Sequence, residues 1–401
     1  MISCDTKTVV DWLADGARSV KRPEMVLADL CDRLAQAGIP LWRVAVFVRT
    51  LHPEIMGRRF IWQQDAGVTI TEGSFDLLER DQFLNSPFVA VIKSGQTIRR
   101  QLGEQNNPKE FSIFRELRAD GATDYLATPL IFTNGSVHVA TWSTQQAGGF
   151  TDAQIAAIET IVKPFARVAE IRALQRTATN LLDTYVGHHA GERILAGRIR
   201  RGHTETIHSV IWLSDMRGFT AMADRLPPQE LVDLLNRYFD CQVPAILRHG
   251  GEVLKFIGDG LLAIFPLAKS TTDARETCDS ALAAAREAQV NIDAIDTLDN
   301  IGNANGVRFG LALHIGEVLY GNIGSGNRLD FTCIGPAVNL AARLEKLAAN
   351  LGRTIILSAE FAQHSPLELE PLGEFAVTGF TAMQSAFGLP PDRAASGGNN
   401  S

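Results

Sequence analysis

Two aspartates in the second half of the chain stand where short apolar runs end. Asp215 follows the run Val210–Leu213, and Asp259 lies in the turn Ile257-Gly258-Asp259-Gly260. Such runs predict buried β-strands, so each carboxylate is expected at the end of a strand. Two carboxylates side by side can hold a pair of Mg²⁺ ions against a triphosphate. The residues therefore predict a divalent-metal site, although a lone aspartate at a strand end is more often a turn or helix cap.

The composition of the chain is that of an ordinary globular protein. Its 401 residues suffice for two domains, and 45% hydrophobic with 21% charged residues is a usual balance. A net charge of −7 disfavours a nucleic-acid partner. No apolar run approaches the roughly 18 residues of a membrane span, and the first residues lack a secretory signal pattern. The five cysteines are scattered, which favours the reducing cytoplasm over a disulfide frame or a zinc site.

Residues 1–162 predict one α/β domain. A helical pattern covers Glu24–Ala37, and β-rich runs follow at Trp42–Val48 and Phe60–Trp62. Further on, Ala122–Thr144 has the pattern of two strands joined at Asn134-Gly135, a strong signal for a tight hairpin turn. The domain is therefore expected to contain a sheet in which at least two strand pairs are antiparallel.

A capping box at Thr151 and Gln154 predicts the helix that closes this domain. Together with the hairpin before it, this helix gives residues Gly121–Val162 an order of elements that resembles a GAF-type sensor domain. The resemblance rests on the pattern and on no signature residue. It implies a sheet that either cradles a small organic ligand or serves dimerisation.

Residues 163–204 predict a connecting helix and transducer segment. Apolar positions from Val168 to Tyr185 step by threes and fours, as on one face of a coiled-coil helix. One interpretation is a parallel dimer helix that carries a signal from the first domain to the second. A single helix packed on either domain would give the same pattern.

Residues 205–390 predict a second domain of mixed α and β structure. Leu231–Leu247 keeps the spacing of a core-facing helix, and a hairpin over Glu252–Phe265 carries Asp259 at its tip. Further elements are expected as a helix at Thr272–Ile295, strands at Val307–Ile315, Val318–Ile323 and Thr354–Leu357, a helix at Pro336–Ala349 and a hairpin at Gly373–Leu389. The small, polar tail 391–401 is expected to be disordered.

Three blocks of this domain, in this order, resemble the catalytic domain of class III nucleotidyl cyclases. They are LSDMRGFT (Leu213–Thr220), KFIGDG (Lys255–Gly260) and FTCIGPAVNLAARLE (Phe331–Glu345). The resemblance implies an α+β fold with a ferredoxin-like core and a head-to-tail homodimer with active sites at its interface. It also implies the reaction, in which the ribose 3′-oxygen attacks the α-phosphorus of a nucleoside triphosphate and pyrophosphate leaves.

The resemblance assigns metal and substrate roles to the first two blocks. Asp215 and Asp259, assisted by the backbone carbonyl of Met216, are the implied ligands of two Mg²⁺ or Mn²⁺ ions per active site. Metal ions suit this chemistry because the attacking hydroxyl is a poor nucleophile and the leaving group is highly charged. Phe219 is placed among the substrate-binding residues.

The third block supplies the implied catalytic residues Asn339 and Arg343. By resemblance, the asparagine orients the ribose and the arginine stabilises charge on the reacting phosphate. Their i, i+4 spacing places both on one helical face. Arginine suits the role because it stays charged and makes forked hydrogen bonds. A polar pair on a helix surface is the plain alternative.

Lys255 and Thr332 are the implied base-reading residues. A lysine can donate to N1 of adenine and a threonine can bridge to the 6-amino group, whereas guanine presents the opposite pattern. ATP is therefore the expected substrate, and the product is 3′,5′-cyclic AMP. A guanylate cyclase is the alternative enzyme.

Arg328 matches a family position that contacts the triphosphate. Thr378, however, stands where many relatives carry a lysine on the same group. This departure leaves a catalytically weak nucleotide-binding regulatory module as a further alternative. The family places the site residues on two subunits, with Asp215, Asp259 and Arg328 on one and Lys255, Thr332, Asn339 and Arg343 on the other. A monomer is thus predicted to be inactive.

Overall fold

The computed structural model describes residues 5–103, 110–267, 271–299, 307–365 and 367–390. The chain divides into two compact units, Met1–Leu181 and Leu182–Ser401. The domain limits predicted at residues 162, 204 and 390 remain predictions, and the predicted tail 391–401 lies outside the described residues. None of the helices in the described ranges combines the length and apolarity needed to cross a membrane.

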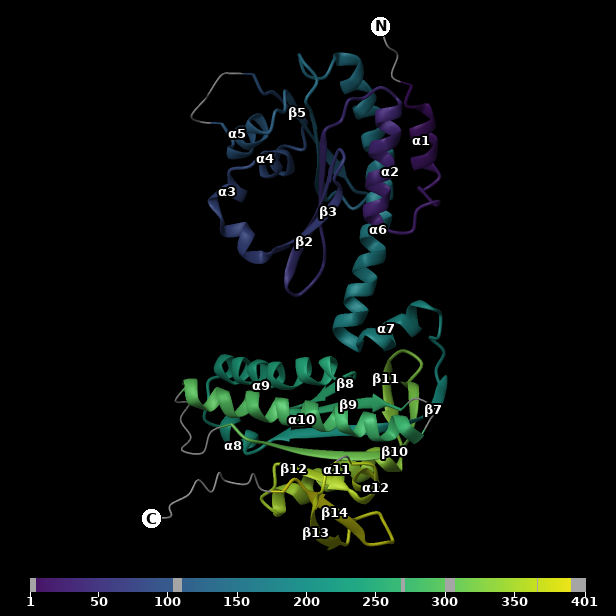
Figure 1. Ribbon diagram of the computed structural model, residues 1–401, viewed down its shortest axis with the longest axis vertical. Coiled ribbons are helices and arrows are strands. Elements are labelled where there is room, and N and C mark those ends of the chain that lie inside the picture. Colours follow the sequence, from purple (N-terminus) through teal and green to yellow (C-terminus); the bar gives the residue numbers. More distant parts are fainter. Residues whose placement is uncertain (1–4, 104–109, 268–270, 300–306, 366, 391–401) are drawn as a thin grey trace, which may run out of the picture. The chain divides into compact units, whose positions relative to one another are not determined.

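Within the described residues, the first unit forms a six-stranded antiparallel sheet in the order β3-β2-β1-β6-β5-β4. The strands are β1 (Arg43–Arg49), β2 (Ile55–Gln63), β3 (Gly67–Ser74), β4 (Ile98–Gln101), β5 (Asp124–Ile131) and β6 (Val137–Thr144). The helices are α1 (Lys7–Ala14), α2 (Pro23–Gln36), α3 (Asp81–Leu84), α4 (Pro87–Ser94), α5 (Ser112–Ala119) and α6 (Asp152–Val186), with a 3-10 helix at Phe75–Glu79. Helices α1, α2 and α6 lie on one face of the sheet, and α3, α4 and α5 lie on the other (Figure 1).

Strand β1 packs against both layers of helices. Val44 and Val46 belong to the core beneath α1, α2 and α6. On the opposite face, the Phe47 ring lies edge-on to Phe83 and Phe88, with centroid distances of 6.4 and 5.9 Å. Successive side chains of a strand point to opposite faces, so the unbroken apolar run of β1 marks a central strand. Its predicted pairing with β2 is confirmed.

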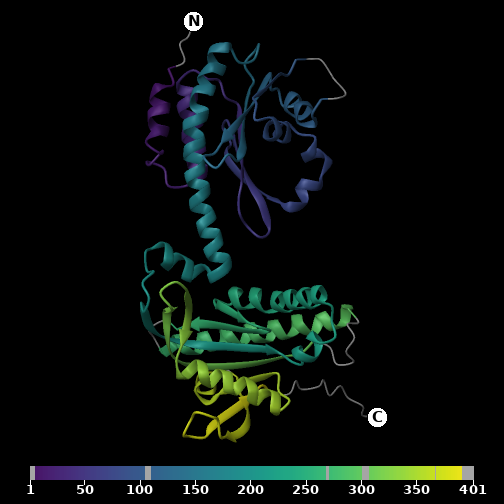
Figure 2. The same cartoon turned by 180° about the vertical axis from the view of Figure 1, so that it is seen from behind.

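The predicted hairpin and capping box are also confirmed. Strands β5 and β6 pair on either side of Asn134-Gly135, where Gly135 has a φ of 82°. The Gln154 amide donates to Thr151 Oγ1 at 3.3 Å, and the Thr151 amide donates to Gln154 Oε1 at 2.9 Å. Helix α6 therefore begins at a closed cap, and it continues as one helix through Pro164. Figure 2 shows this helix without a break from behind.

In the part of the second unit that the structure describes, an eight-stranded sheet has the order β13-β14-β12-β10-β7-β9-β8, with β11 paired to β10. The strands are β7 (Thr204–Met216), β8 (Glu252–Ile257), β9 (Gly260–Pro266), β10 (Phe309–Gly324), β11 (Leu329–Ile334), β12 (Ile355–Ser358), β13 (Glu370–Phe375) and β14 (Gln384–Gly388). The helices are α7 (His188–Leu195), α8 (Phe219–Ala223), α9 (Pro228–Arg248), α10 (Thr271–Asp299), α11 (Pro336–Asn350) and α12 (Ala359–His364). The chain order β7-α9-β8-β9-α10-β10 is the β-α-β-β-α-β order of a ferredoxin-like core, as expected from the sequence.

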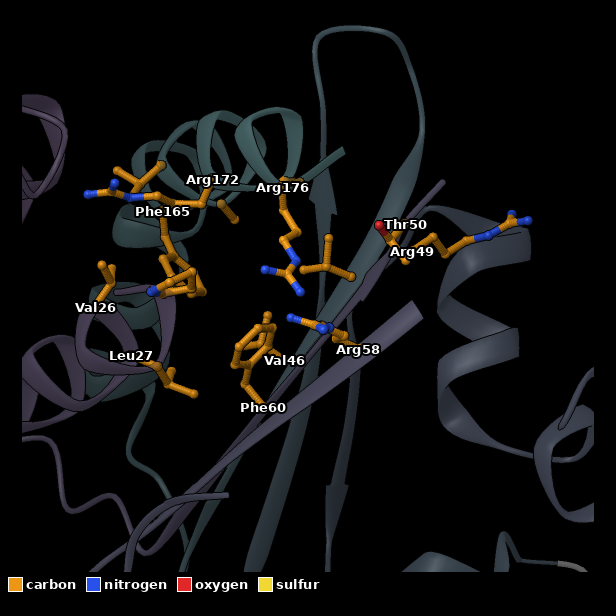
Figure 3. A pocket seen from close by; sticks show the side chains of 15 residues that line it. Val26, Leu27, Val46, Arg49, Thr50, Arg58, Phe60, Phe165, Arg172 and Arg176 are labelled. Atoms are coloured by element: carbon orange, nitrogen blue, oxygen red, sulfur yellow. The ribbon is translucent and has the colours of Figure 1, made fainter. Parts of the chain in front are cut away.

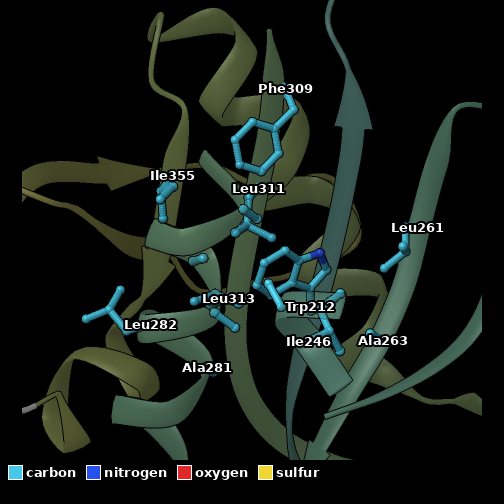
Figure 4. Close-up of a cluster of buried hydrophobic side chains, with 14 of the residues drawn as sticks. Trp212, Ile246, Leu261, Ala263, Ala281, Leu282, Phe309, Leu311, Leu313 and Ile355 are labelled. Atoms are coloured by element: carbon cyan, nitrogen blue, oxygen red, sulfur yellow. The ribbon is translucent and has the colours of Figure 1, made fainter. Parts of the chain in front are cut away.

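This sheet is also covered on both faces. Trp212 of β7 and Leu311 of β10 lie in one core cluster with Ile246 of α9 and Leu282 of α10 (Figure 4). On the other face, α11 packs Leu344 and its neighbours against β10 and β12. The ends of β7 and β9 are therefore anchored in a double-sided core, which makes them rigid supports for polar side chains.

Strand β10 differs from the sequence-based expectation of two strands, Val307–Ile315 and Val318–Ile323. The structure has one strand, Phe309–Gly324, and its pairing with β7 continues across Gly316. Gly316 lies in the expected gap between the two strands, where it serves close packing within one continuous strand. A Cβ at position 316 would lie 2.7 Å from the Cβ of Ala337 in α11.

Candidate active site

The two predicted metal ligands lie next to each other. Asp215 is the penultimate residue of β7, and Asp259 occupies the turn between β8 and β9, the strand that pairs with β7. A Cβ at the neighbouring Gly260 would be 3.4 Å from Asp215 Oδ1. Burial, a hydrogen bond with Asp259 and the charge of Asp259 raise the pKa of Asp215 to about 7. The pair thus concentrates negative charge that a divalent cation would neutralise.

Two carboxylates alone do not complete a metal's coordination shell. Across the described ranges, no group of three or more His, Cys, Asp or Glu side chains is arranged to hold a metal. Mg²⁺ in nucleotide sites is commonly held by one or two carboxylates, with substrate phosphates and waters supplying the other oxygens. The backbone carbonyl of Met216 directly follows Asp215 and adds one oxygen. The donor set therefore fits a cation site that a bound triphosphate completes.

A buried polar chain supports β7 just before the carboxylate. The Trp212 indole Nε1 donates to Ser214 Oγ at 3.3 Å, and Ser214 Oγ donates to Gln242 Oε1 of α9 at 2.6 Å. Since Ser214 and Asp215 are neighbours in a strand, their side chains point to opposite faces. The chain of hydrogen bonds therefore ties the strand to α9 and leaves the Asp215 carboxylate to the other side.

An ion pair that the sequence did not reveal lies beside the carboxylates. Arg217 Nη1 is 2.5 Å from Glu345 Oε1 of α11, and Glu345 is only 4% exposed. The guanidinium lies across Gly310, where a Cβ would fall 1.7 Å from Arg217 Nη2. Both residues stand inside the blocks already singled out, so their charges were visible but their pairing was not. The pair fixes the start of the loop after β7 against α11.

Asn339 and Arg343 face away from the carboxylate pair of their own chain. A helix turns by about 100° per residue, so Arg343 lies about 200° and Asn339 about 240° around the α11 axis from Glu345. Their exposure agrees with this, since both are exposed whereas Glu345 is buried against Arg217. The structure therefore does not bring these two residues to the carboxylates within one chain.

Lys255 and Thr332, by contrast, lie in one neighbourhood. Lys255 Nζ is 3.9 Å from Oδ2 of Asp330, which shares a face of β11 with Thr332 because the two are alternate residues. Thr332 is 3% exposed, and its Oγ1 has no hydrogen-bond partner within the described part of the chain. Such a buried, unpartnered hydroxyl costs about 1–3 kcal/mol. Cys333 packs into the core instead, where burial raises its pKa to about 11.

The remaining predicted residues lie in loops or at helix starts. Phe219 begins α8, directly after Gly218 with a φ of 76°, and packs half-buried against the core beneath α9 and α10. Arg328 is exposed in the turn between β10 and β11, and its guanidinium has no ion-pair partner among the residues described. Thr378 is exposed after β13. Arg328 is thus an available cation, and position 378 offers none.

Part of the second unit is similar to known proteins. Residues 203–387 match the adenylate and guanylate cyclase catalytic domain. An adenylate cyclase of Anabaena cylindrica is 32% identical over 164 residues, which are 40% of this chain and 31% of that protein. An uncharacterised protein of Mycobacterium tuberculosis (strain H37Rv) is 34% identical over 188 residues, which are 46% of this chain and 33% of that protein. The match thus spans about a third of the length of these relatives.

A solved structure is also similar to part of this chain. The adenylyl cyclase CyaB from P. aeruginosa has a TM-score of 0.41 and 26% identity, covering 48% of this chain and 98% of that chain.

Proposed function

We propose that this chain converts ATP to 3′,5′-cyclic AMP and pyrophosphate, because residues 203–387 match the adenylate and guanylate cyclase catalytic domain. The observation that carries the proposal is the meeting of Asp215 and Asp259 at one end of the buried strands β7 and β9. Folding alone does not favour two neighbouring carboxylates in a half-buried place, whereas binding of a metal–triphosphate does.

The proposal assigns two Mg²⁺ or Mn²⁺ ions per active site to Asp215, Asp259 and the carbonyl of Met216. When bound, such ions lower the pKa of an attacking hydroxyl and offset the charge of a leaving pyrophosphate. The chain contributes by holding the carboxylates on anchored strands, while the Arg217–Glu345 pair fixes the loop that follows. Arg328 adds a free cation for the triphosphate.

The complete site is proposed to form between two copies of the chain. The α11 geometry supports this, because Asn339 and Arg343 are turned away from the carboxylates that their own chain supplies. In a head-to-tail dimer, one protomer would supply the carboxylates and its partner would supply α11. Asn339 would then orient the ribose, and Arg343 would stabilise charge on the reacting phosphate by forked hydrogen bonds.

Lys255 and Thr332 support adenine as the base. A lysine cation donates to a ring acceptor, and the buried Thr332 hydroxyl lacks a partner that the 6-amino group of adenine would supply. The ion pair with Asp330 keeps Lys255 of β8 beside the face of β11 that carries Thr332. A guanylate cyclase would need an acceptor where Lys255 stands.

The first unit is proposed to be a GAF-like sensor that regulates the cyclase through α6. Its antiparallel sheet between two helical layers supports this assignment. On α6, Ile171 and Leu174 are 51% and 63% exposed, and exposed apolar side chains at such spacing suit a parallel dimer helix. The four cysteines of the described residues are free thiols, which supports the cytoplasm as the place of action.

One assay tests the proposed reaction. The full chain is incubated with ATP or GTP and with Mg²⁺ or Mn²⁺, and the products are separated by chromatography. We expect cyclic AMP, dependent on the divalent ion, with an Asp215→Asn preparation as the control for contaminating activity. Faster turnover of GTP would establish the guanylate cyclase instead. Nucleotide binding without product would establish a regulatory module.

A further inference from the structure

A cavity in the first unit lies outside everything assigned to the reaction. It opens between α2, strands β1 and β2, and the second half of the α6 segment that belongs to this unit (Figure 3). Its enclosed volume is about 80 Å³. Since a water-sized group occupies about 30 Å³, the cavity has room for roughly three such groups below its mouth.

The floor of the cavity is apolar. Val26 of α2, Val46 of β1, Phe60 of β2 and Phe165 of α6 line it, and all of them belong to the core layer beneath α2 and α6. The floor lies on the opposite face of the sheet from Phe47 and its aromatic neighbours. A polar molecule gains nothing from such a floor, whereas a short hydrocarbon group gains about 25 cal/mol for each Å² that it buries.

The rim of the cavity is cationic. In Figure 3 the guanidinium groups of Arg58 and Arg176, two residues that line the cavity, point toward one another. Arg176 has no ion-pair partner in the ranges that the structure describes. Arg58 pairs with Glu72, but its Nε is buried without a hydrogen-bond partner. Glu72 offsets only one of the two guanidinium charges, so an anion between Arg58 and Arg176 would balance the second charge and accept donors that are still unused.

The other arginines of the cavity do not take part in this convergence. The Arg172 guanidinium donates to the carbonyl oxygen of Val20 at 2.7 Å and is thereby engaged. Arg49 also borders the cavity, but it alternates with Val46 and Val48 along β1, and Figure 3 shows its guanidinium directed away from those of Arg58 and Arg176. The chain therefore offers an internal control, because Arg49 carries the same charge and borders the same cavity but directs its guanidinium elsewhere.

We propose that this cavity binds a small organic anion with one carboxylate and a short apolar body. The apolar body enters between α2 and α6, and the carboxylate lies between Arg58 and Arg176. A carboxylate matches the planar fork of an arginine, which can hold both oxygens. The enclosed volume favours a body of a few carbon atoms, with any longer chain lying across the open mouth.

The site touches the helix that leads out of the first unit. Phe165, Val168, Ala169, Ala173 and Arg176 all belong to α6. An anion held by Arg176 would therefore bias the position of α6 against β2. A consequence for cyclase activity rests on the proposed function, whereas binding itself does not.

Hexanoate is the probe for the binding test, with the full chain titrated and followed by saturation-transfer NMR. Arg176→Gln and Arg58→Gln should each weaken hexanoate binding about tenfold, as expected for the loss of a charge-assisted hydrogen bond. Arg49→Gln should leave the affinity unchanged. Hexylammonium should not bind, and affinity should rise from acetate to hexanoate because the apolar body grows.

A second variant guards against misfolding of the arginine mutants. Ala169→Leu adds apolar volume to the floor and keeps both arginines, so it should abolish binding while the chain keeps its wild-type circular dichroism. Equal loss in Arg49→Gln and Arg176→Gln would overturn the site, as would hexanoate binding that Ala169→Leu leaves intact. No detectable binding of hexanoate or its shorter and longer homologues would overturn it as well.

The regulatory consequence is tested separately. If hexanoate binds as described and shifts cyclic AMP formation in the wild type but not in Arg176→Gln, the site regulates the enzyme. If it binds as described and cyclic AMP formation is unchanged, the binding site stands and the gating role of the first unit fails.

Discussion

Each of the two units brings like charges close together, and the sign of the charge differs between them. In the second unit, two carboxylates meet at the end of strands β7 and β9. In the first unit, two guanidinium groups meet over an apolar cavity. Arg217 shows what a balanced charge looks like, since it lies flat on Gly310 against the buried Glu345. The Arg217–Glu345 ion pair holds the elements around it in position. Two like charges that lie close together instead form a site where an ion of the opposite charge can bind.

The strongest test of this contrast is Asp215→Asn. Loss of a metal ligand removes several kcal/mol of transition-state stabilisation, so cyclase activity should fall by about a thousandfold. Stability should stay level or rise, because the change removes repulsion between like charges. Activity and thermal unfolding of the same preparation measure both effects. Asp233→Asn on the exposed side of α9 is the matched control, and a large loss of stability in Asp215→Asn would contradict a ligand-binding role for the pair.

The second test asks whether the carboxylates and α11 act in the same chain. Asp215→Asn and Asn339→Ala chains should each be inactive alone. After mixing and subunit exchange, half of the dimers are mixed and each has one intact site, so about a quarter of wild-type activity should return. Mixtures that dimerise and remain inactive would contradict the shared site.

The third test concerns the ion pair between Arg217 and Glu345. Arg217→Gln leaves Glu345 buried without its partner, and burial already raises the pKa of that carboxyl. We expect a loss of about 3 kcal/mol in the free energy of unfolding, measured by urea titration. Arg343→Gln serves as the control, because that arginine is exposed on the other side of α11. Equal stability losses in the two variants would argue against a positioning role for Arg217.

The fourth test lies in the first unit and depends on pH. Burial, helped by the charge of Arg49, lowers the pKa of His138 from 6.5 to about 4, against the opposing charge of Glu170. The Arg49 amide donates to His138 Nδ1 at 3.1 Å, so the native ring is neutral. Stability is therefore complete above pH 6.5 and decreases as pH falls toward 4, by at most about 1.4 kcal/mol per unit.

Urea unfolding followed by tryptophan fluorescence measures this dependence, since Trp142 is buried in the same unit. His138→Gln should remove the acid-side slope. An unchanged slope in that variant would mean that other groups control the acid stability of the unit.

Local chemistry made much of this structure predictable. The Asn134-Gly135 turn and the capping box of Thr151 and Gln154 act over a few residues, and both formed as expected. The adjacency of Asp215 and Asp259 followed from two strand ends in matched blocks.

The features that the sequence could not predict are contacts between residues that lie far apart in the chain. Gly316 fell between two expected strands, and only the packing of α11 shows that it is a contact point within one strand. Arg58 and Arg176 come from a strand and a helix far apart in the chain, and no spacing pattern connects them. The Arg217–Glu345 pair was hidden for the same reason.

The contact between Gly310 and Arg217 predicts how natural substitutions at position 310 would act. One added methyl group at this position would collide with the guanidinium that lies on it. The displaced arginine would lose its ion pair with Glu345 and free the loop beside the carboxylates, so a substitution at a residue without a side chain would resemble an active-site lesion. Alleles that change this glycine to alanine should therefore be scored as loss-of-function candidates, despite their conservative chemistry.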